Sequence, residues 1–336
     1  MKFLNKTKNQ HFISQAEQRF NSINPNATYN NQRIYSFTVI DRENNLFKLE
    51  SKNGIKIQHN LFMQDLFSFD IKDKNNRYNF EELFQKYEEK LSFSTKSLLY
   101  KIDNHNFNLC DEIRDIVISK QVIDLRNPYC ITKTINTYGH LVNFHPTNPS
   151  LHQNYLRIIK GNQPQKKRIC NTLGITDEQY NAWLRICYMV LVTLNNEELS
   201  ILDQIWENII KEPKTIFYGM IFHYTKENCI MNDRNSCELV NTNGTLLKLY
   251  NINSKTFLAF TLSTIDDLLK SNENTKNICN NILENIRKAK PYHIFTSVHI
   301  DNLDALERYN RNTAYQCYER IFCASQNCYG LDIFTP

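Results

Sequence analysis

The sequence predicts an α+β protein, in which an N-terminal β meander is followed by a central helical bundle, a second small antiparallel sheet and C-terminal helices. Two observations predict this class. Apolar and polar residues alternate near the N-terminus and again after Ile210, whereas apolar residues recur with a helical period between those regions. An apolar fraction of 41% in 336 residues also supplies enough side chains for a large core.

The N-terminal meander begins with two alternating runs. Arg33 to Asp41 and Leu46 to Ser51 flank an Asn-rich turn, which is the pattern of a β-hairpin. Lys52-Asn53-Gly54 offers a second turn, which leads into a third run from Ile55 to His59. We therefore expect short strands that follow one another along the chain.

The helical bundle begins at Asn79, where the apolar period changes to 3.6 residues. Phe80, Leu83, Tyr87 and Leu91 then share one face of a helix. Further helices are predicted over Leu109 to Leu125, Asn148 to Ile159, Thr176 to Leu194 and Glu197 to Ile210. Their ends are indicated by Pro and Gly and by a Thr-x-x-Gln capping pattern.

The C-terminal third returns to short runs rich in aromatic and β-branched residues, which favour strands. The predicted strands are Thr215 to Tyr224, Leu246 to Ile252 and Thr256 to Leu262. A helix over Ile265 to Ala289, a strand over His293 to Ile300 and an amphipathic helix over Asn302 to Ala324 complete the prediction.

The whole chain, 1–336, is expected to form one domain. The polar loop from Gly161 to Arg168 is the best candidate for a boundary inside it, because it combines Gly, Pro and three basic residues. The same composition also suits an exposed loop within one domain.

Several function classes are excluded by glycine spacing. The seven glycines are too far apart to form the phosphate-binding GxGxxG or GxxxxGK[ST] loops or the GxSxG nucleophile elbow. The ten cysteines include no CxxC pair, which favours packed free thiols over zinc ligands in a reducing, cytoplasmic compartment. No apolar stretch is long enough for a membrane span.

Nucleic acid or a nucleotide is the expected partner, although the net charge of +5 is modest. Lys166, Lys167 and Arg168 form a basic cluster that could contact phosphates, and Tyr155 and Trp183 could offer stacking surfaces. Simple solvation of the loop is the alternative interpretation of these charges.

Polar residues at apolar helix positions indicate a buried network. Gln121 lies four residues from both Val117 and Leu125, so its amide faces the inner stripe. Arg126 follows at the helix end, and Glu88 is a suitable partner for it. Such a network either fixes the packing or forms part of a catalytic site.

Asp233 lies at the end of a predicted strand, in a turn, where reactive carboxylates are often placed. Capping of that turn by Asn232 and Asp233 is the alternative interpretation.

Short motifs along the chain resemble the prokaryotic domain-of-unknown-function family 4238. His11-Phe12-Ile13-Ser14-Gln15 is similar to the His-Tyr-Val-Pro-Gln motif that opens the family, with Ser14 at the proline position. Gln121, Arg126 and Pro128 resemble a Gln-to-Arg-x-Pro element of the family. Asn232 to Asn235 resembles a Ser-Asp-Asn-Pro turn that keeps only its aspartate, and Asn310 belongs to a similar closing helix.

The resemblance implies one domain in which the matched polar residues converge. We expect an enzyme that acts on phosphate esters, a nuclease-like or phosphodiesterase effector in prokaryotic defence. His11 would be the general acid or base, Asp233 would orient it or a metal ion, and Arg126 would stabilise a phosphoryl oxygen. The substrate would be bound by Gln15, Glu88, Gln121 and Asn310. A two-carboxylate metal site of Glu88 and Asp233 would require Mg²⁺, whereas a site of His11 and Arg126 would not. The alternative is a non-enzymatic binding or regulatory module with a buried polar network.

Overall fold

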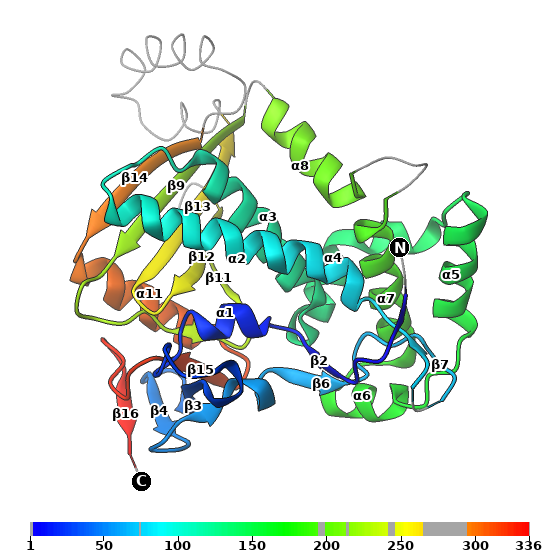
Figure 1. The fold of residues 1–336 in the computed structure, drawn as a ribbon, viewed down its shortest axis with the longest axis horizontal. Helices are drawn as coiled ribbons and strands as arrows, with labels where there is room; N and C mark the ends of the chain where they lie inside the picture. Colours follow the sequence, from blue (N-terminus) through cyan, green and yellow to red (C-terminus); the bar gives the residue numbers. More distant parts are fainter. Residues whose placement is uncertain are drawn as a thin grey trace.

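The computed structural model describes residues 3–73, 75–193, 199–212, 215–240, 246–264 and 294–335, and it confirms the α+β class (Figure 1). The α-helices are α1 (Gln15–Arg19), α2 (Glu81–Asp103), α3 (Cys110–Arg126), α4 (Ile131–Tyr138), α5 (Pro149–Lys160), α6 (Lys166–Leu173), α7 (Asp177–Leu191), α8 (Ile201–Lys211) and α11 (Leu303–Tyr315). The first strands are β1 (Leu4–Asn5), β2 (Asn9–His11), β3 (Arg33–Asp41), β4 (Leu46–Leu49), β5 (Ile55–Lys56), β6 (Phe62–Gln64), β7 (Asp70–Ile71) and β8 (Arg77–Tyr78). The later strands are β9 (Thr215–His223), β10 (Met231–Asn232), β11 (Ser236–Val240), β12 (Leu246–Asn253), β13 (Thr256–Thr264), β14 (Ile294–Ile300), β15 (Arg320–Cys323) and β16 (Asp332–Phe334).

The predicted second sheet is confirmed. Its strand order is β11-β12-β13-β9-β14, and all pairs are antiparallel except β14 with β9, which are parallel. Successive residues of β13 face opposite sides, as in any strand. Leu258 and Phe260 join the main core, whereas Phe257 and Ala259 pack with Leu306 of α11.

Helices α2 and α3 run side by side across this sheet in Figure 1, and α3 contacts β14. Both were predicted from their apolar period, and α3 ends one residue beyond the predicted Leu125. Among the described residues, no helix is both long and apolar enough to cross a bilayer.

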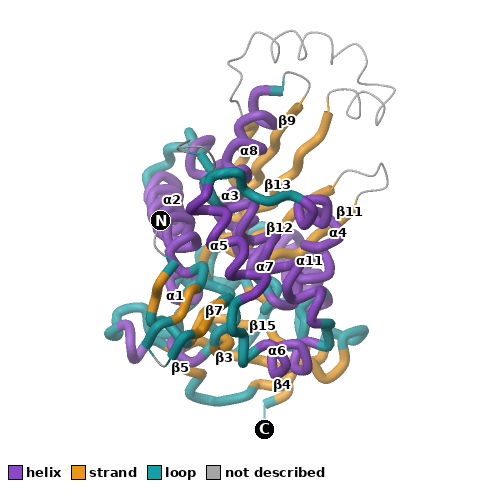
Figure 2. The backbone as a smooth tube through the Cα atoms, turned by 90° about the vertical axis from the view of Figure 1, so that its right-hand side faces the viewer, coloured by secondary structure: helices purple, strands orange, loops and turns teal. Residues whose placement is uncertain are grey.

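The N-terminal hairpin is also confirmed, but its sheet is not a purely local meander. The strand order is β10-β15-β3-β4-β16, with β5 paired to β3. Three of these strands come from the last third of the chain, and Figure 2 shows β3, β4 and β15 near the C-terminus. The edges of β3 and β4 are therefore covered by distant segments, which a local pattern cannot predict.

The predicted C-terminal helix over Asn302 to Ala324 is wrong in its second half. Helix α11 ends at Tyr315, and the chain turns into β15 at Arg320. The carboxylate of Asp233 binds three backbone N–H groups in the intervening turn, which satisfies them without a helix. The helix predicted over Ile265 to Ala289 lies outside the described residues.

Helices α4 to α7 form the rest of the bundle, and α7 lies at its centre. Trp183 of α7 is fully buried, and its indole N–H donates to the carbonyl of Leu125 at 2.7 Å. The main core is one packed cluster whose members come from along the chain, the first being Phe3 and the last Phe322. Helices and both larger sheets contribute to it. The segment 161–168 is bound to the N-terminal region, because Gln165 donates to the carbonyl of Ser68 at 2.6 Å.

Candidate functional site

Four of the predicted site residues lie together where α1, α2 and the end of α3 meet. His11 ends β2, Gln15 begins α1, Glu88 lies on α2, and Arg126 is the last residue of α3. The Arg126 side chain connects these elements, because it contacts both Glu88 and the carbonyl of Phe12. We call this group, together with Arg19 and Glu81, the Arg126 cluster.

Arg126 is the buried centre of the cluster, with 1% of its surface exposed. Its Nε donates to the Phe12 carbonyl at 3.1 Å, and its Nη1 donates to Glu88 Oε1 at 2.6 Å, so the predicted pairing with Glu88 is present. The guanidinium lies 4.9 Å from the centre of the Phe84 ring. Its Nη2 is buried and finds no hydrogen-bond partner within the described chain. A buried guanidinium with one free side is suited to an anionic oxygen.

His11 is held in one orientation by a chain of hydrogen bonds. Its Nδ1 lies 2.9 Å from the carbonyl of Asn60, so the ring proton resides on Nδ1. Its Nε2 accepts from the Gln15 amide at 3.0 Å, while Gln15 Oε1 accepts from Arg19 at 2.7 Å. Burial is the main cause that lowers the pKa of His11 to about 4, and the charge of Arg126 contributes to this shift. His11 is therefore neutral at pH 7, with a lone pair on Nε2.

Glu81 is a member of the cluster that the sequence prediction missed. It lies two helical turns before Glu88 on α2, and its Oε1 is buried without a hydrogen-bond partner among the described residues. Burial raises the pKa of Glu81 to about 7, while Arg126 lowers it and Glu88 raises it. Both protonation states are thus populated near neutral pH. The spacing of seven residues was the only available sequence signal, since it places both carboxyl groups on one helix face.

Asp233 is bonded to a different part of the molecule from His11. Its carboxylate accepts the backbone N–H groups of Tyr318, Glu319 and Arg320 at 2.6, 2.7 and 2.9 Å. These bonds order the turn before β15. The Asp233 carboxylate is therefore occupied by a distant turn, and neither the local cap of its own turn nor an orienting contact with His11 is among its hydrogen bonds within the described residues.

Asn310 and Gln121 are likewise bonded away from the cluster. Asn310 is fully buried on α11, accepts from the N–H of Ile230 at 3.2 Å and donates to the carbonyl of Tyr329 at 3.0 Å. Gln121 is half-buried, and its Oε1 accepts from the indole of Trp206 at 2.8 Å. The amide of Gln121 thus has the inward partner that its position required, and it joins α3 to α8.

The predicted Mg²⁺ pair is not brought together by these contacts. Glu88 binds Arg126, whereas Asp233 binds the turn before β15. No group of three or more His, Cys, Asp or Glu side chains with metal-binding geometry occurs in the part of the chain that the structure describes.

The prediction that Tyr155 and Trp183 offer stacking surfaces beside the basic cluster is wrong. Tyr155 and Trp183 are both buried in the core, because α5 and α7 pack with these faces inward. Arg168 donates to the backbone carbonyl of Gln64 at 2.6 Å, and Lys166 forms an ion pair with Asp177 at 3.5 Å. Arg168 therefore joins α6 to β6, and Lys166 joins the start of α6 to the start of α7.

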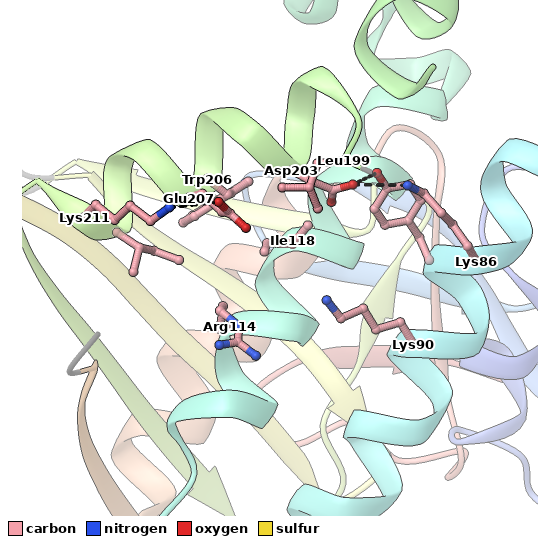
Figure 3. A pocket seen from close by; sticks show the side chains of 11 residues that line it. Lys86, Lys90, Arg114, Ile118, Leu199, Asp203, Trp206, Glu207 and Lys211 are labelled. Atoms are coloured by element: carbon pink, nitrogen blue, oxygen red, sulfur yellow. Dashed lines mark hydrogen bonds and ion pairs between the residues drawn. The ribbon is translucent and has the colours of Figure 1, made fainter. Parts of the chain in front are cut away.

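A cavity of about 530 Å³ lies between α2, α3 and α8 (Figure 3). Its basic lining residues are Lys86, Lys90, Arg114 and Lys211. Each of these cations lies within 3.1 Å of a carboxylate oxygen. Figure 3 shows Lys86 of α2 reaching Asp203 of α8. The positive charge is thus compensated. The pair of Lys86 with Asp203 joins α2 to α8, and the pair of Lys90 with Asp115 joins α2 to α3.

No family model, curated protein or solved structure matches this chain.

Proposed function

We propose that the Arg126 cluster hydrolyses phosphate esters, as a nuclease-like enzyme or phosphodiesterase. One observation carries the proposal. A buried carboxyl group with a pKa of about 7, Glu81, lies near a buried guanidinium, Arg126, whose Nη2 has no protein partner among the described residues. A group that can both donate and accept a proton at neutral pH, beside a cation suited to a phosphoryl oxygen, favours acid–base hydrolysis.

Three residues of the cluster have separate roles in the proposed reaction. Arg126 Nη2 binds a non-bridging phosphoryl oxygen and stabilises its charge. The attacking water replaces the Gln15 amide at His11 Nε2, which accepts the water's proton as the new phosphorus–oxygen bond forms. Protonated Glu81 gives its proton to the leaving oxygen as the old bond breaks. Gln15 and Arg19 hold the His11 ring in position, and Glu88 holds Arg126.

The test is the cleavage of labelled RNA, single-stranded DNA and duplex DNA, each with Mg²⁺ or with EDTA. We expect the wild type to cleave at least one of them and Glu81→Gln to lose about 10²- to 10⁴-fold in rate. The rate should fall as pH rises through about 7, the pKa of Glu81, because the protonated acid is lost. Glu89→Gln, on the exposed side of the same helix, should stay within about twofold of wild type.

Melting temperatures separate catalysis from folding in this experiment. Glu81→Gln should melt no lower than the wild type, because its amide carries no buried charge. Failure of the wild type to cleave any substrate, with or without Mg²⁺, would overturn the proposal. Equal losses of cleavage rate in Glu81→Gln and Glu89→Gln would also contradict the proposal.

A non-enzymatic binding or regulatory module is the second candidate. It is favoured by the hydrogen-bonding of Asp233, Asn310 and Gln121, which all have protein partners suited to a structural role. This candidate predicts loss of stability on mutation and no turnover. The expected role in prokaryotic defence stays a prediction, because no feature of the site bears on it.

A further inference from the structure

A second cavity, of about 550 Å³, lies beside the short 3-10 helix η3 (Pro128–Cys130), directly after Arg126. Its lining includes Tyr129, Lys133, Arg234 and Tyr318, together with Thr132 and Asn136. None of the described residues that line it is Asp or Glu. Lys133 forms an ion pair with Glu238 at 2.5 Å, outside the lining. Arg234 is thus the one lining cation for which the described residues provide no ion pair.

Two tyrosine rings are stacked in the wall of this cavity. The centres of Tyr129 and Tyr318 are 4.2 Å apart, and the planes differ by 13°. Tyr318 is 38% exposed, so part of its side chain stays accessible to a ligand although one face of the ring lies against Tyr129. Exposed aromatic rings beside cations form the usual platform for an unpaired base, since every base has a π face.

The cation that accompanies the rings is Arg234. Its guanidinium lies 5.8 Å from the centre of the Tyr318 ring. Its Nε is buried, and no acceptor among the described residues hydrogen-bonds to it. A buried N–H without an acceptor costs free energy, unless a ligand supplies the acceptor. A phosphate oxygen is the acceptor that a guanidinium binds best, since the bond is charge-assisted.

The two tyrosines are held in place by buried side chains. Asn127 Oδ1 accepts from the N–H of Tyr129 at 3.0 Å, and its amide donates to the carbonyl of Asp233 at 2.8 Å. Asp233 Oδ1 in turn accepts from the N–H of Tyr318 at 2.6 Å. This network fixes the backbone of both tyrosines, and the stacking orders their rings before any ligand arrives, which reduces the entropy lost on binding. It also gives the buried Asp233 a positioning role.

We propose that this cavity binds a nucleotide unit, with the base against Tyr318 and Tyr129 and the phosphate on Arg234. The exposed side chains of Thr132 and Asn136 offer further donors at the lining, whereas Lys133 is paired with Glu238. The site adjoins the Arg126 cluster, since Tyr129 contacts Phe12 with ring centres 5.4 Å apart. The proposal that this cavity binds a nucleotide does not depend on the proposed hydrolysis, because binding can occur without turnover.

The test measures binding in EDTA, by calorimetry with adenosine monophosphate, adenosine and inorganic phosphate, and by fluorescence anisotropy with a short labelled oligoadenylate. We expect Tyr318→Ala to weaken binding of adenosine monophosphate about 5- to 100-fold, the range for one lost stacking contact. Tyr318→Phe, which keeps the ring, should stay within about twofold. Arg234→Gln should weaken the phosphate-bearing probes about tenfold or more and leave adenosine unchanged.

Arg308→Gln is the matched control, since it removes one positive charge from an exposed position on α11. Binding that falls equally in Arg234→Gln and Arg308→Gln would reduce the site to a general charge effect and overturn the proposal. So would the absence of binding by the wild type at millimolar adenosine monophosphate and micromolar oligoadenylate. Tighter binding of the oligoadenylate than of the free nucleotide would identify RNA as the source of the ligand, and the reverse order would identify a free nucleotide.

Discussion

At the residue scale, His11 and Glu81 have pKa values shifted in opposite directions by the same cause. Burial favours the neutral form of each, so the pKa of His11 falls to about 4 and that of Glu81 rises to about 7. The stability that comes from burying neutral His11 is fully present above pH 6.5, the ordinary pKa of the ring, and is lost as pH falls towards 4. The stability that comes from burying neutral Glu81 is fully present below pH 4.5, the ordinary pKa of the carboxyl group, and is lost as pH rises through 7.

The Glu81 shift predicts a mutation that stabilises the protein only at higher pH. At about pH 8 the wild type must keep an ionised Glu81 buried, whereas Glu81→Gln is neutral. The free energy of unfolding of the variant, relative to wild type, should therefore rise by about 2–3 kcal/mol between pH 4 and pH 8. Chemical denaturation at several pH values checks this. A relative stability that instead fell with pH would mean that Arg126 holds Glu81 ionised.

At the element scale, the site is made by the junction of α1, α2 and α3 rather than by any one of them. Arg126 extends from the end of α3 to the backbone just before α1 and to the middle of α2. Helix α3 also carries Lys120, which forms a buried ion pair with Glu17 of α1. Two buried cations of α3 therefore fix α1, which suits a site that requires accurate geometry.

The connection from α5 to α6 is another element-scale feature. The segment 161–168 contacts the strand region 68–71, since the N–H of Ile71 donates to Asn162 at 2.9 Å. At Gly161 an added Cβ would meet the backbone oxygens of both Arg157 and Phe69. Only glycine fits this close approach between two backbone segments.

Gly161→Ala should therefore destabilise the protein by about 2–4 kcal/mol, because backbone atoms cannot move aside as a side chain can. The matched control is Gly139→Ala. There φ is −59°, and the nearest atom to the added Cβ is Ile135 Cγ2 at 3.9 Å. The control should change stability by less than about 1 kcal/mol. Unfolding curves in urea measure both, and equal values for the two variants would contradict the described packing at Gly161.

At the scale of the whole molecule, one core joins segments from both ends of the chain, and the thiols are packed into it and its neighbours. Nine of the ten cysteines lie in the described residues, and seven of those nine are buried. Burial raises the pKa of Cys187 and Cys229, among others, so their reactive thiolate forms are scarce.

Thiol labelling should reveal this burial. We expect at most three of the ten cysteines, which is ten minus the seven buried ones, to react within minutes with a thiol reagent at about pH 8. All ten should react in denaturant. Rapid reaction of more than three in the native protein would mean that the core opens on the labelling timescale.

Much of the fold could be predicted from the sequence. The alternation in Arg33–Asp41 marked β3 without error, and the capping pattern at Thr176 marked the start of α7. These signals are local, because they depend on which face of one element is buried. The end of α11 could not be predicted this way, since a carboxylate about 85 residues earlier, that of Asp233, ends the helical run.

The candidate site was predictable only in part. Gln121 at an apolar helix position indicated a buried polar network. Arg126 follows at the end of the same helix, and Glu88 was expected as its partner because a buried charge requires one. Glu81 and the stacked Tyr129 and Tyr318 gave no such local signal. Their properties depend on neighbours that are distant in sequence.

The sequence by itself therefore determined the class, the order of most elements and the burial of certain charges, since hydrophobic periodicity and the cost of unpaired polar groups act locally. Only the tertiary structure decided that His11, Glu81 and Arg126 share one site and that Asp233 lies in another. The physical reason is that a pKa and a hydrogen bond depend on distance in space, which the packing of α1, α2 and α3 sets.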